Sequence, residues 1–77
     1  MAVPLELFRK GDVYIDFPFE DVLYRYEFKT RRLFCRFYGC PENEIAQDSK
    51  LFHDAISAGA VTTAERYAQG GPSQSDL

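Results

Sequence analysis

The chain has 77 residues, of which 45% are hydrophobic and 16% aromatic, and its formal net charge is −3. This length allows a single domain, and the hydrophobic content argues against an intrinsically disordered chain. No stretch approaches the roughly 20 apolar residues that a transmembrane helix needs. A domain of this size buries only about 60% of the surface that its unfolded chain exposes, so its stability margin is narrow.

The charge is unevenly distributed along the chain. Residues 1–24 carry a net charge of −3, residues 25–36 a net charge of +4, and residues 37–77 a net charge of −4. A basic segment inside an acidic protein can attract an anionic partner. The alternative is that this segment pairs with acidic helices of the same chain.

Two short strands are predicted before the basic segment. Residues 3–9 alternate apolar and polar side chains, which predicts a strand, with a frayed N-terminal end as the alternative. Lys10-Gly11-Asp12 is a turn signal, and residues 12–17 alternate again. Pro18 lacks the N–H group that a strand ladder needs, so the second strand ends there or lies at a sheet edge.

The sequence YRYEFKTRRLFCRFYG, residues 24–39, predicts a β-hairpin with strands near 22–29 and 32–38. A two-residue turn at Thr30-Arg31 gives a register in which the paired apolar residues share one face: Phe28 with Leu33, Tyr26 with Cys35 and Tyr24 with Phe37. A four-residue loop over 29–32 keeps this facing and avoids a tight turn that favours Asn and Gly. The register also sets Arg25 opposite Arg36, which is unfavourable for like charges.

Two short helices are predicted after a polar loop over residues 39–47. Asp48 has the side chain of an N-cap for a helix over 49–58, which Gly59 ends. The apolar stripe of this helix is Leu51, Phe52, Ala55 and Ile56. Thr62 and Glu65 have the spacing of a capping box for a second helix that extends to Ala68.

Strands followed by helices indicate an α+β fold. We predict an antiparallel three- to four-stranded β-meander followed by two short helices packed on one sheet face, the apolar one. Residues 1–70 are predicted to form this single domain, and residues 71–77 a disordered C-terminal tail. Because both helices are assigned to the apolar face, the opposite face of the hairpin is predicted to be open to solvent or to a partner.

No catalytic, metal or cofactor site is predicted. His53 is the only histidine and lies off the apolar stripe of its helix, so we expect a surface residue. Cys35 fits the core as a small buried hydrophobe, and Cys40 fits an exposed loop; a disulfide between them and a zinc site that includes His53 are the alternatives. The sequence has no phosphate-binding loop and no nucleophile motif, and we predict that the protein is not an enzyme.

The open face and the turn of the hairpin are the candidate binding surface, which is both basic and aromatic: Arg25, Lys29, Arg31, Arg32, Phe34, Arg36 and Tyr38. Arginine and aromatic residues are enriched at protein interfaces, and the net negative charge of the chain favours a protein partner. We therefore predict a small non-enzymatic binding or regulatory protein that docks on another protein through this surface. With no signal peptide or membrane segment apparent, we expect it in the cytoplasm.

Two other hypotheses use the same sequence features. Single-stranded nucleic acid, RNA in particular, can stack its bases on exposed aromatic rings while Arg and Lys hold the phosphates. An obligate homodimer would bury the outer sheet face or an edge strand between two copies.

Overall fold

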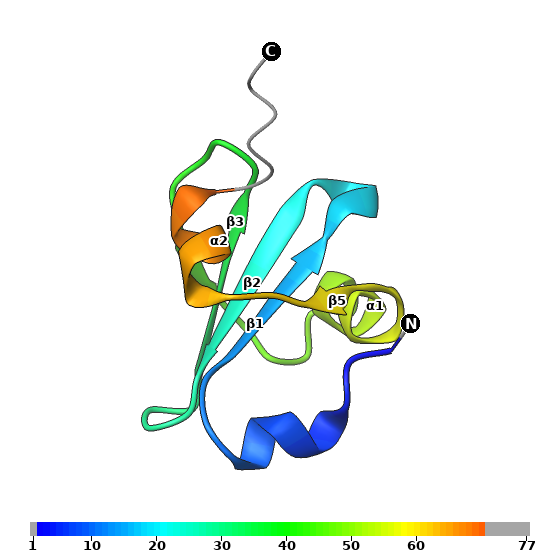
Figure 1. Ribbon diagram of the computed structural model, residues 1–77, viewed down its shortest axis with the longest axis vertical. Helices are drawn as coiled ribbons and strands as arrows, with labels where there is room; N and C mark the ends of the chain where they lie inside the picture. The colour runs from blue at the N-terminus through cyan, green and yellow to red at the C-terminus, as the bar shows by residue number, and fades with distance from the viewer. Residues whose placement is uncertain (1, 71–77) are drawn as a thin grey trace.

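The computed structural model describes residues 2–70, which form a five-stranded antiparallel sheet with strand order β4-β3-β2-β1-β5 and two short α-helices (Figure 1). The strands are β1 (Val13–Phe17), β2 (Val22–Glu27), β3 (Arg32–Phe37), β4 (Asn43–Ile45) and β5 (Ala60–Val61). The helices are α1 (Lys50–Ala58) and α2 (Ala64–Gln69), and two 3-10 helices are η1 (Leu5–Arg9) and η2 (Pro18–Glu20). The predicted α+β class and antiparallel meander are confirmed, although the sheet has five strands rather than the predicted three to four, because the short strands β4 and β5 were not predicted. The tail predicted over residues 71–77 lies outside the described residues.

The strand predicted over residues 3–9 is wrong, because this segment forms η1. Leu5 is 63% exposed, whereas the ring of Phe8 packs edge-on against Tyr26 with the centroids 5.2 Å apart. Val3 is buried, and its N–H donates to the carbonyl of Ile56 at 2.8 Å. Packing of this segment against the core therefore overrides the alternating pattern.

The β2–β3 hairpin has the predicted facing but not the predicted register. Tyr26 pairs with Leu33 rather than Cys35, so the strands are shifted by two residues and the loop covers residues 28–31. The N–H of Arg31 donates to the carbonyl of Glu27 at 2.8 Å, and Arg31 adopts a left-handed conformation with φ of 62°. A shift of two residues leaves every side chain on its predicted face, because side chains alternate with a period of two.

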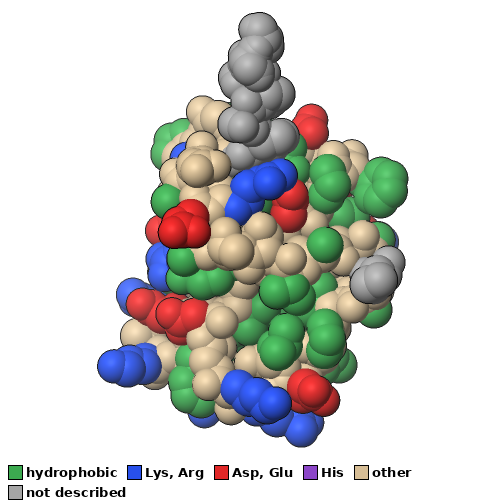
Figure 2. Space-filling model, in the orientation of Figure 1, with side chains coloured by type: hydrophobic (Ala, Val, Ile, Leu, Met, Phe, Trp, Pro, Cys, Tyr) green, Lys and Arg blue, Asp and Glu red, His purple; other side chains and the backbone are tan. Residues whose placement is uncertain are grey.

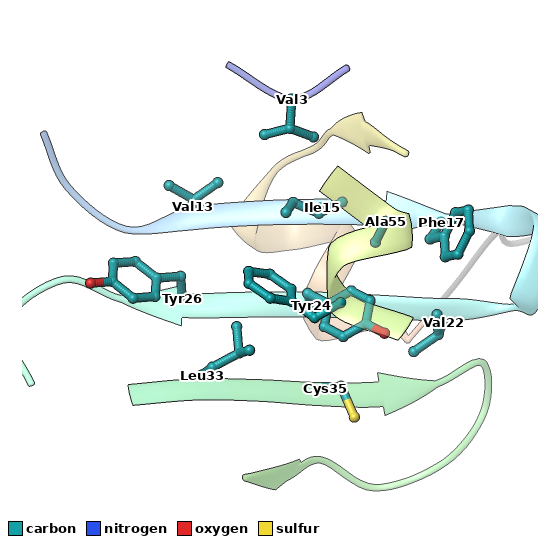
Figure 3. Close-up of a cluster of buried hydrophobic side chains, with 11 residues drawn as sticks. Val3, Val13, Ile15, Phe17, Val22, Tyr24, Tyr26, Leu33, Cys35 and Ala55 are labelled. Carbon is teal, nitrogen blue, oxygen red and sulfur yellow. The ribbon is translucent and has the colours of Figure 1, made fainter. Parts of the chain in front are cut away.

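The core lies on one face of the sheet, which α1 covers (Figure 3). Its buried side chains come from the sheet, from α1 and from the N-terminal segment: Val13, Ile15, Phe17, Val22, Tyr24, Tyr26, Leu33, Cys35, Phe52, Ala55 and Val3. The ring of Phe52 packs with its centroid 5.4 Å from that of Tyr24. The N-cap of α1 is Ser49 rather than the predicted Asp48, because the Ser49 hydroxyl accepts from the Phe52 N–H at 3.4 Å. Among the described residues, no helix has the length and apolar character needed to cross a membrane.

The Tyr24 hydroxyl gives a stability prediction. Tyr24 is 1% exposed, and its hydroxyl has no hydrogen-bond partner among the described residues. A buried hydroxyl without a partner costs about 1–3 kcal/mol, so Tyr24→Phe is expected to raise the free energy of unfolding by about 1 kcal/mol in urea denaturation. Tyr26→Phe, at a position with 8% exposure, is the matched control and should change little. A loss of stability in Tyr24→Phe would contradict this view of the core.

α2 lies on the face of the sheet opposite α1, so the prediction that both helices pack on one face is wrong. β5 pairs with the edge of β1, with Val61 opposite Ile15, and then leads the chain to the other side of the sheet (Figure 1). There the ring of Tyr67 packs 5.9 Å from that of Tyr14, which points away from the core. Tyr67 is the only buried residue of α2, so this helix has no apolar stripe from which its face could be predicted. Its N-cap is Thr63 rather than Thr62.

Candidate protein-binding surface

The observed register places Arg25 of β2 opposite Phe34 of β3 rather than opposite Arg36. The Arg25 guanidinium lies over the Phe34 ring, 4.1 Å from its centroid, which is a favourable cation–π geometry. Arg36 lies opposite Leu23 instead. The predicted like-charge pair is therefore absent, and a stabilising contact replaces it.

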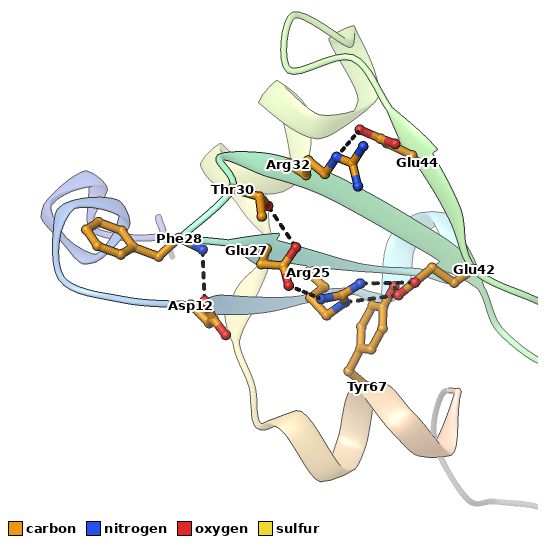
Figure 4. Close-up of polar contacts among 9 residues, drawn as sticks. All are labelled: Asp12, Arg25, Glu27, Phe28, Thr30, Arg32, Glu42, Glu44 and Tyr67. Carbon is orange, nitrogen blue, oxygen red and sulfur yellow. Dashed lines mark hydrogen bonds and ion pairs between the residues drawn. The ribbon is translucent and has the colours of Figure 1, made fainter.

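Arg25 is also held by a carboxylate from the loop that precedes β4 (Figure 4). Its Nε donates to Glu42 Oε1 at 3.0 Å and its Nη2 donates to Glu42 Oε2 at 3.1 Å. The Tyr67 hydroxyl donates to the same Oε1 at 2.7 Å. Glu42 thus joins β2 to α2: it binds the Arg25 guanidinium in a bidentate manner and accepts one further hydrogen bond from Tyr67.

These contacts predict a dependence of stability on pH. The hydrogen bond with Arg25, aided by that with Tyr67, holds the pKa of Glu42 below its ordinary value of 4.5 despite partial burial. A lowered pKa in the folded state stabilises the fold above the ordinary pKa, and this contribution is lost as the pH falls through the lower value. We expect the free energy of unfolding to decrease as the pH is lowered from about 4.5. This decrease should be less steep in Glu42→Gln. Urea denaturation between about pH 3 and pH 6 measures both slopes.

Glu65→Gln is the matched control for this experiment. Glu65 lies on α2, is exposed and has no ion pair among the described residues. Its pH profile should follow that of the unmodified chain. Parallel profiles for Glu42→Gln and Glu65→Gln would show that the Glu42 contacts do not stabilise the fold.

Arg36 binds the C-terminal end of α2. Its Nη1 donates to the carbonyl of Tyr67 at 3.2 Å and to that of Ala68 at 3.3 Å. A cation is favourable there, because the last carbonyls of a helix carry partial negative charge. Gly70 leaves room for the Arg36 side chain, because a Cβ at this position would lie 2.7 Å from Arg36 Nη2. Its φ of +81° also favours glycine.

Asp16 of β1 binds both Tyr38, which follows β3, and Arg66 of α2. The Tyr38 hydroxyl donates to Asp16, and Arg66 Nη2 lies 3.1 Å from the second oxygen of the same carboxylate. Burial raises the pKa of the Tyr38 hydroxyl, and the hydrogen bond to Asp16 raises it further. Tyr38 is therefore a structural link between β1 and the end of β3.

The exposed positive charges of the predicted binding surface lie in and next to the turn of the hairpin. Lys29, Arg31 and Arg32 are all exposed. Arg32 lies 3.4 Å from Glu44 of β4 in an ion pair between two solvated side chains, and such pairs contribute little stability. The Arg31 guanidinium lies 5.4 Å from the centroid of the Phe28 ring.

The open basic and aromatic face predicted from the sequence is therefore not open. Four of the seven predicted residues, Arg25, Phe34, Arg36 and Tyr38, are half-buried and engaged within the chain, with α2 packed on their face. Whether any of the seven contacts a partner stays a prediction. Sequence reasoning missed the groups that engage them, chiefly Glu42 and Tyr67; its alternative, that the basic segment pairs with acids of the same chain, placed those acids in the helices.

Exposed apolar side chains lie elsewhere on the molecule. Among the described residues, the large hydrophobic side chains with the highest exposed fractions are Phe19 at 80%, Leu5 at 63%, Val61 at 49% and Phe37 at 46%. Figure 2 shows apolar side chains gathered between η1 and β5, where a hollow of about 330 Å³ is lined in part by Leu7, Tyr14 and Val61. Its lining mixes these with Lys10 and Asp12.

The cysteines and the histidine form no common site. Cys35 is buried and Cys40 exposed, and both are free thiols. Burial raises the pKa of the Cys35 thiol. His53 is exposed, with its ring beside that of Phe52. No group of three or more His, Cys, Asp or Glu side chains among residues 2–70 is arranged to hold a metal ion.

Three comparisons with known proteins all find similarity to immunity proteins or to a complex that contains one. The family model of the Tis1 immunity protein matches residues 1–71. The immune protein Tis1 of Pseudomonas aeruginosa strain UCBPP-PA14 is 41% identical over 69 residues, which cover 87% of this chain and 90% of that protein. A chain in the crystal structure of the complex between the Type VI effector Tas1 and its immunity protein is 38% identical, with a TM-score of 0.85 and coverage of 94% of this chain and 97% of that one.

The fold and these similarities define the class of the protein: it is a small α+β protein of the immunity type. Within that class, the chain belongs to the Tis1 immunity protein family.

Proposed function

We propose that this protein binds a Type VI effector similar to Tas1 and neutralises it by forming a complex with it. The observation that carries the proposal is the similarity to a chain of the Tas1–immunity protein complex, with a TM-score of 0.85 and 38% identity over 94% of this chain. The similarity extends over nearly the whole of both chains, so it concerns the complete folded domain rather than a shared segment. A protein partner also agrees with the prediction made from composition and charge.

We infer that the protein acts by binding rather than by catalysis. The polar groups on the α2 side of the sheet are engaged with one another. The Glu42 carboxylate accepts two hydrogen bonds from Arg25 and one from Tyr67. The Asp16 carboxylate accepts from Tyr38 and Arg66. Groups held in this way stabilise the fold and are poorly placed to transfer protons.

The residues predicted as partner contacts differ in how a partner could reach them. Lys29, Arg31 and Arg32 project from the hairpin turn and remain candidate contacts. To meet a partner fully, Arg25 would have to leave Glu42 and Arg36 would have to leave the α2 carbonyls, because their guanidinium groups bind these acceptors. The same contacts disfavour the nucleic-acid alternative, since these two arginines are not free to bind phosphates, and the comparisons give no support to that alternative or to a homodimer.

Co-expression tests the proposed function. The host's effector similar to Tas1 would be induced in a test bacterium with and without this chain, and growth would be followed. We expect the chain to restore growth, and we expect the two proteins to elute together in size-exclusion chromatography. No rescue and separate elution of two folded proteins would contradict the proposal.

A further inference from the structure

Phe19 is the most exposed large hydrophobic side chain among the described residues, at 80%. It lies on η2, which joins β1 to β2 at the end of the sheet far from the hairpin turn (Figure 1). Phe37, 46% exposed, belongs to the same end, because it pairs with Val22, the first residue of β2. Two partly solvated phenylalanines therefore mark one end of the sheet.

The backbone next to Phe19 is held by two hydrogen bonds at Asp21. The N–H of Asp21 donates to the carbonyl of Pro18 at 3.2 Å, and the carbonyl of Asp21 accepts from the N–H of Tyr38 at 2.8 Å. Asp21 adopts a left-handed conformation with φ of 54°, and the Phe19 ring packs edge-on against Phe17 with centroids 6.1 Å apart. The exposed ring is thus presented on an ordered turn, which reduces the entropy lost when a partner binds.

The charge around Phe19 is negative and is not neutralised within the described part of the chain. Glu20 and Asp21 follow Phe19 directly, and neither has an ion pair among residues 2–70. On the α2 face, by contrast, Asp16 and Glu42 each lie within 3.1 Å of an arginine nitrogen. Glu20 and Asp21 therefore differ from Asp16 and Glu42: no ion pair within residues 2–70 neutralises them, and both are exposed beside the Phe19 ring.

The Tyr24 hydroxyl is an independent feature of the same end. It is buried without a hydrogen-bond partner among the described residues, and it points along β2 toward Val22 (Figure 3). Burial raises its pKa, and Cys35, Asp54 and Glu20 add to the rise in that order. Because Tyr24 is 1% exposed, this oxygen belongs to the core beneath the surface and is not itself a partner contact.

We propose that this end of the sheet, termed the Phe19 surface and formed by Phe19, Glu20, Asp21 and Phe37, is where the protein docks on its Type VI effector. The proposal rests on the function proposed above. The complementary surface on the effector is an apolar recess that receives the Phe19 ring and is rimmed by Lys or Arg side chains. An aromatic anchor surrounded by polar contacts is the usual organisation of a binding hot spot, and complementary charge at the rim speeds association.

Titration calorimetry with the purified effector tests the proposal. Phe19→Ala is expected to raise Kd by about 30-fold or more, the range of a hot-spot residue. Glu20→Lys is expected to slow association by about tenfold at low salt, as measured by surface plasmon resonance. Because Phe19 is exposed, the thermal unfolding midpoint of free Phe19→Ala should stay near that of the unmodified chain, and circular dichroism checks this.

Two further variants separate the outcomes. Leu5→Ala removes an exposed apolar side chain on η1, at the opposite end of β1 from η2 (Figure 1), and should bind as the unmodified chain does. Lys29→Glu with Arg31→Glu tests the hairpin turn as the competing surface. Loss of affinity in the hairpin variant with full affinity in Phe19→Ala overturns the Phe19 surface but leaves the proposed function in place. Equal affinity of all variants also overturns it, whereas failure of the unmodified chain to bind removes the proposed function itself.

Discussion

Tyr67→Ala is expected to lower the free energy of unfolding by about 3 kcal/mol, in the range measured when a buried aromatic side chain is truncated. Tyr67 is 5% exposed and is the only buried residue of α2. Its ring packs on Tyr14, and its hydroxyl donates to Glu42. In a domain of this size each kcal/mol moves the thermal midpoint by roughly 4–8 °C, so the midpoint should fall by about 12–24 °C in differential scanning calorimetry.

Tyr67→Phe is the matched control for this prediction. It keeps the ring and removes only the hydrogen bond to Glu42, so the loss should be about 1 kcal/mol. Equal losses in the two variants would mean that the hydroxyl, and not the ring, attaches α2 to the sheet. A small loss in Tyr67→Ala would mean that α2 is not a structural part of the domain.

Gly59→Ala is expected to have an effect of similar size for a different reason. A Cβ at Gly59 would lie 2.6 Å from the Ala55 carbonyl oxygen and 3.0 Å from that of Asp16. Both are backbone atoms, so neither can move aside as a flexible side chain would. Either α1 or β1 must shift, and we expect a loss of about 2–3 kcal/mol in urea denaturation, typical of overpacking in a tightly packed site.

Gly11→Ala provides the comparison. A Cβ at Gly11 would meet no atom within 4 Å, and the backbone there is not in the left-handed region. Replacement of such a glycine commonly leaves stability unchanged or raises it by about 0.4–1 kcal/mol, because the unfolded chain loses freedom. A similar destabilisation in both variants would show that the close approach at Gly59 does not set its cost.

The sequence was sufficient to predict which side chains of the hairpin share a face, and insufficient to predict its register. Alternation has a period of two, so a shift of two residues leaves the pattern unchanged. What distinguishes the two registers is the partner of Arg25: another arginine in the predicted register, and the Phe34 ring in the observed one. The charge repulsion noted in the predicted register was therefore the signal that favoured the other.

The position of α2 could not be predicted, and it changes the candidate site most. A helix of six residues with one buried aromatic has no stripe that assigns it to a face. The acids that neutralise the basic segment also come from an unexpected place. Arg25 and Arg32 pair with Glu42 and Glu44, which lie in and before β4 and not in the helices.

Phe19 was missed for a related reason. In the sequence it lies between Pro18 and the polar residues Glu20 and Asp21, so the segment resembles an ordinary break between strands. Nothing in the pattern distinguishes an aromatic that folds inward from one that stays in solvent. Only the arrangement of η2 shows that the ring remains exposed on an ordered turn.

Hydrogen–deuterium exchange of the chain, free and bound to its effector, tests the central claim most directly. We expect effector-dependent protection over residues 17–22 and at the end of β3 near Phe37, and little change in the hairpin loop over 28–31. Protection confined to the loop over 28–31, or to α2, would contradict the Phe19 surface. Identical exchange in every segment with effector in excess would contradict effector binding altogether.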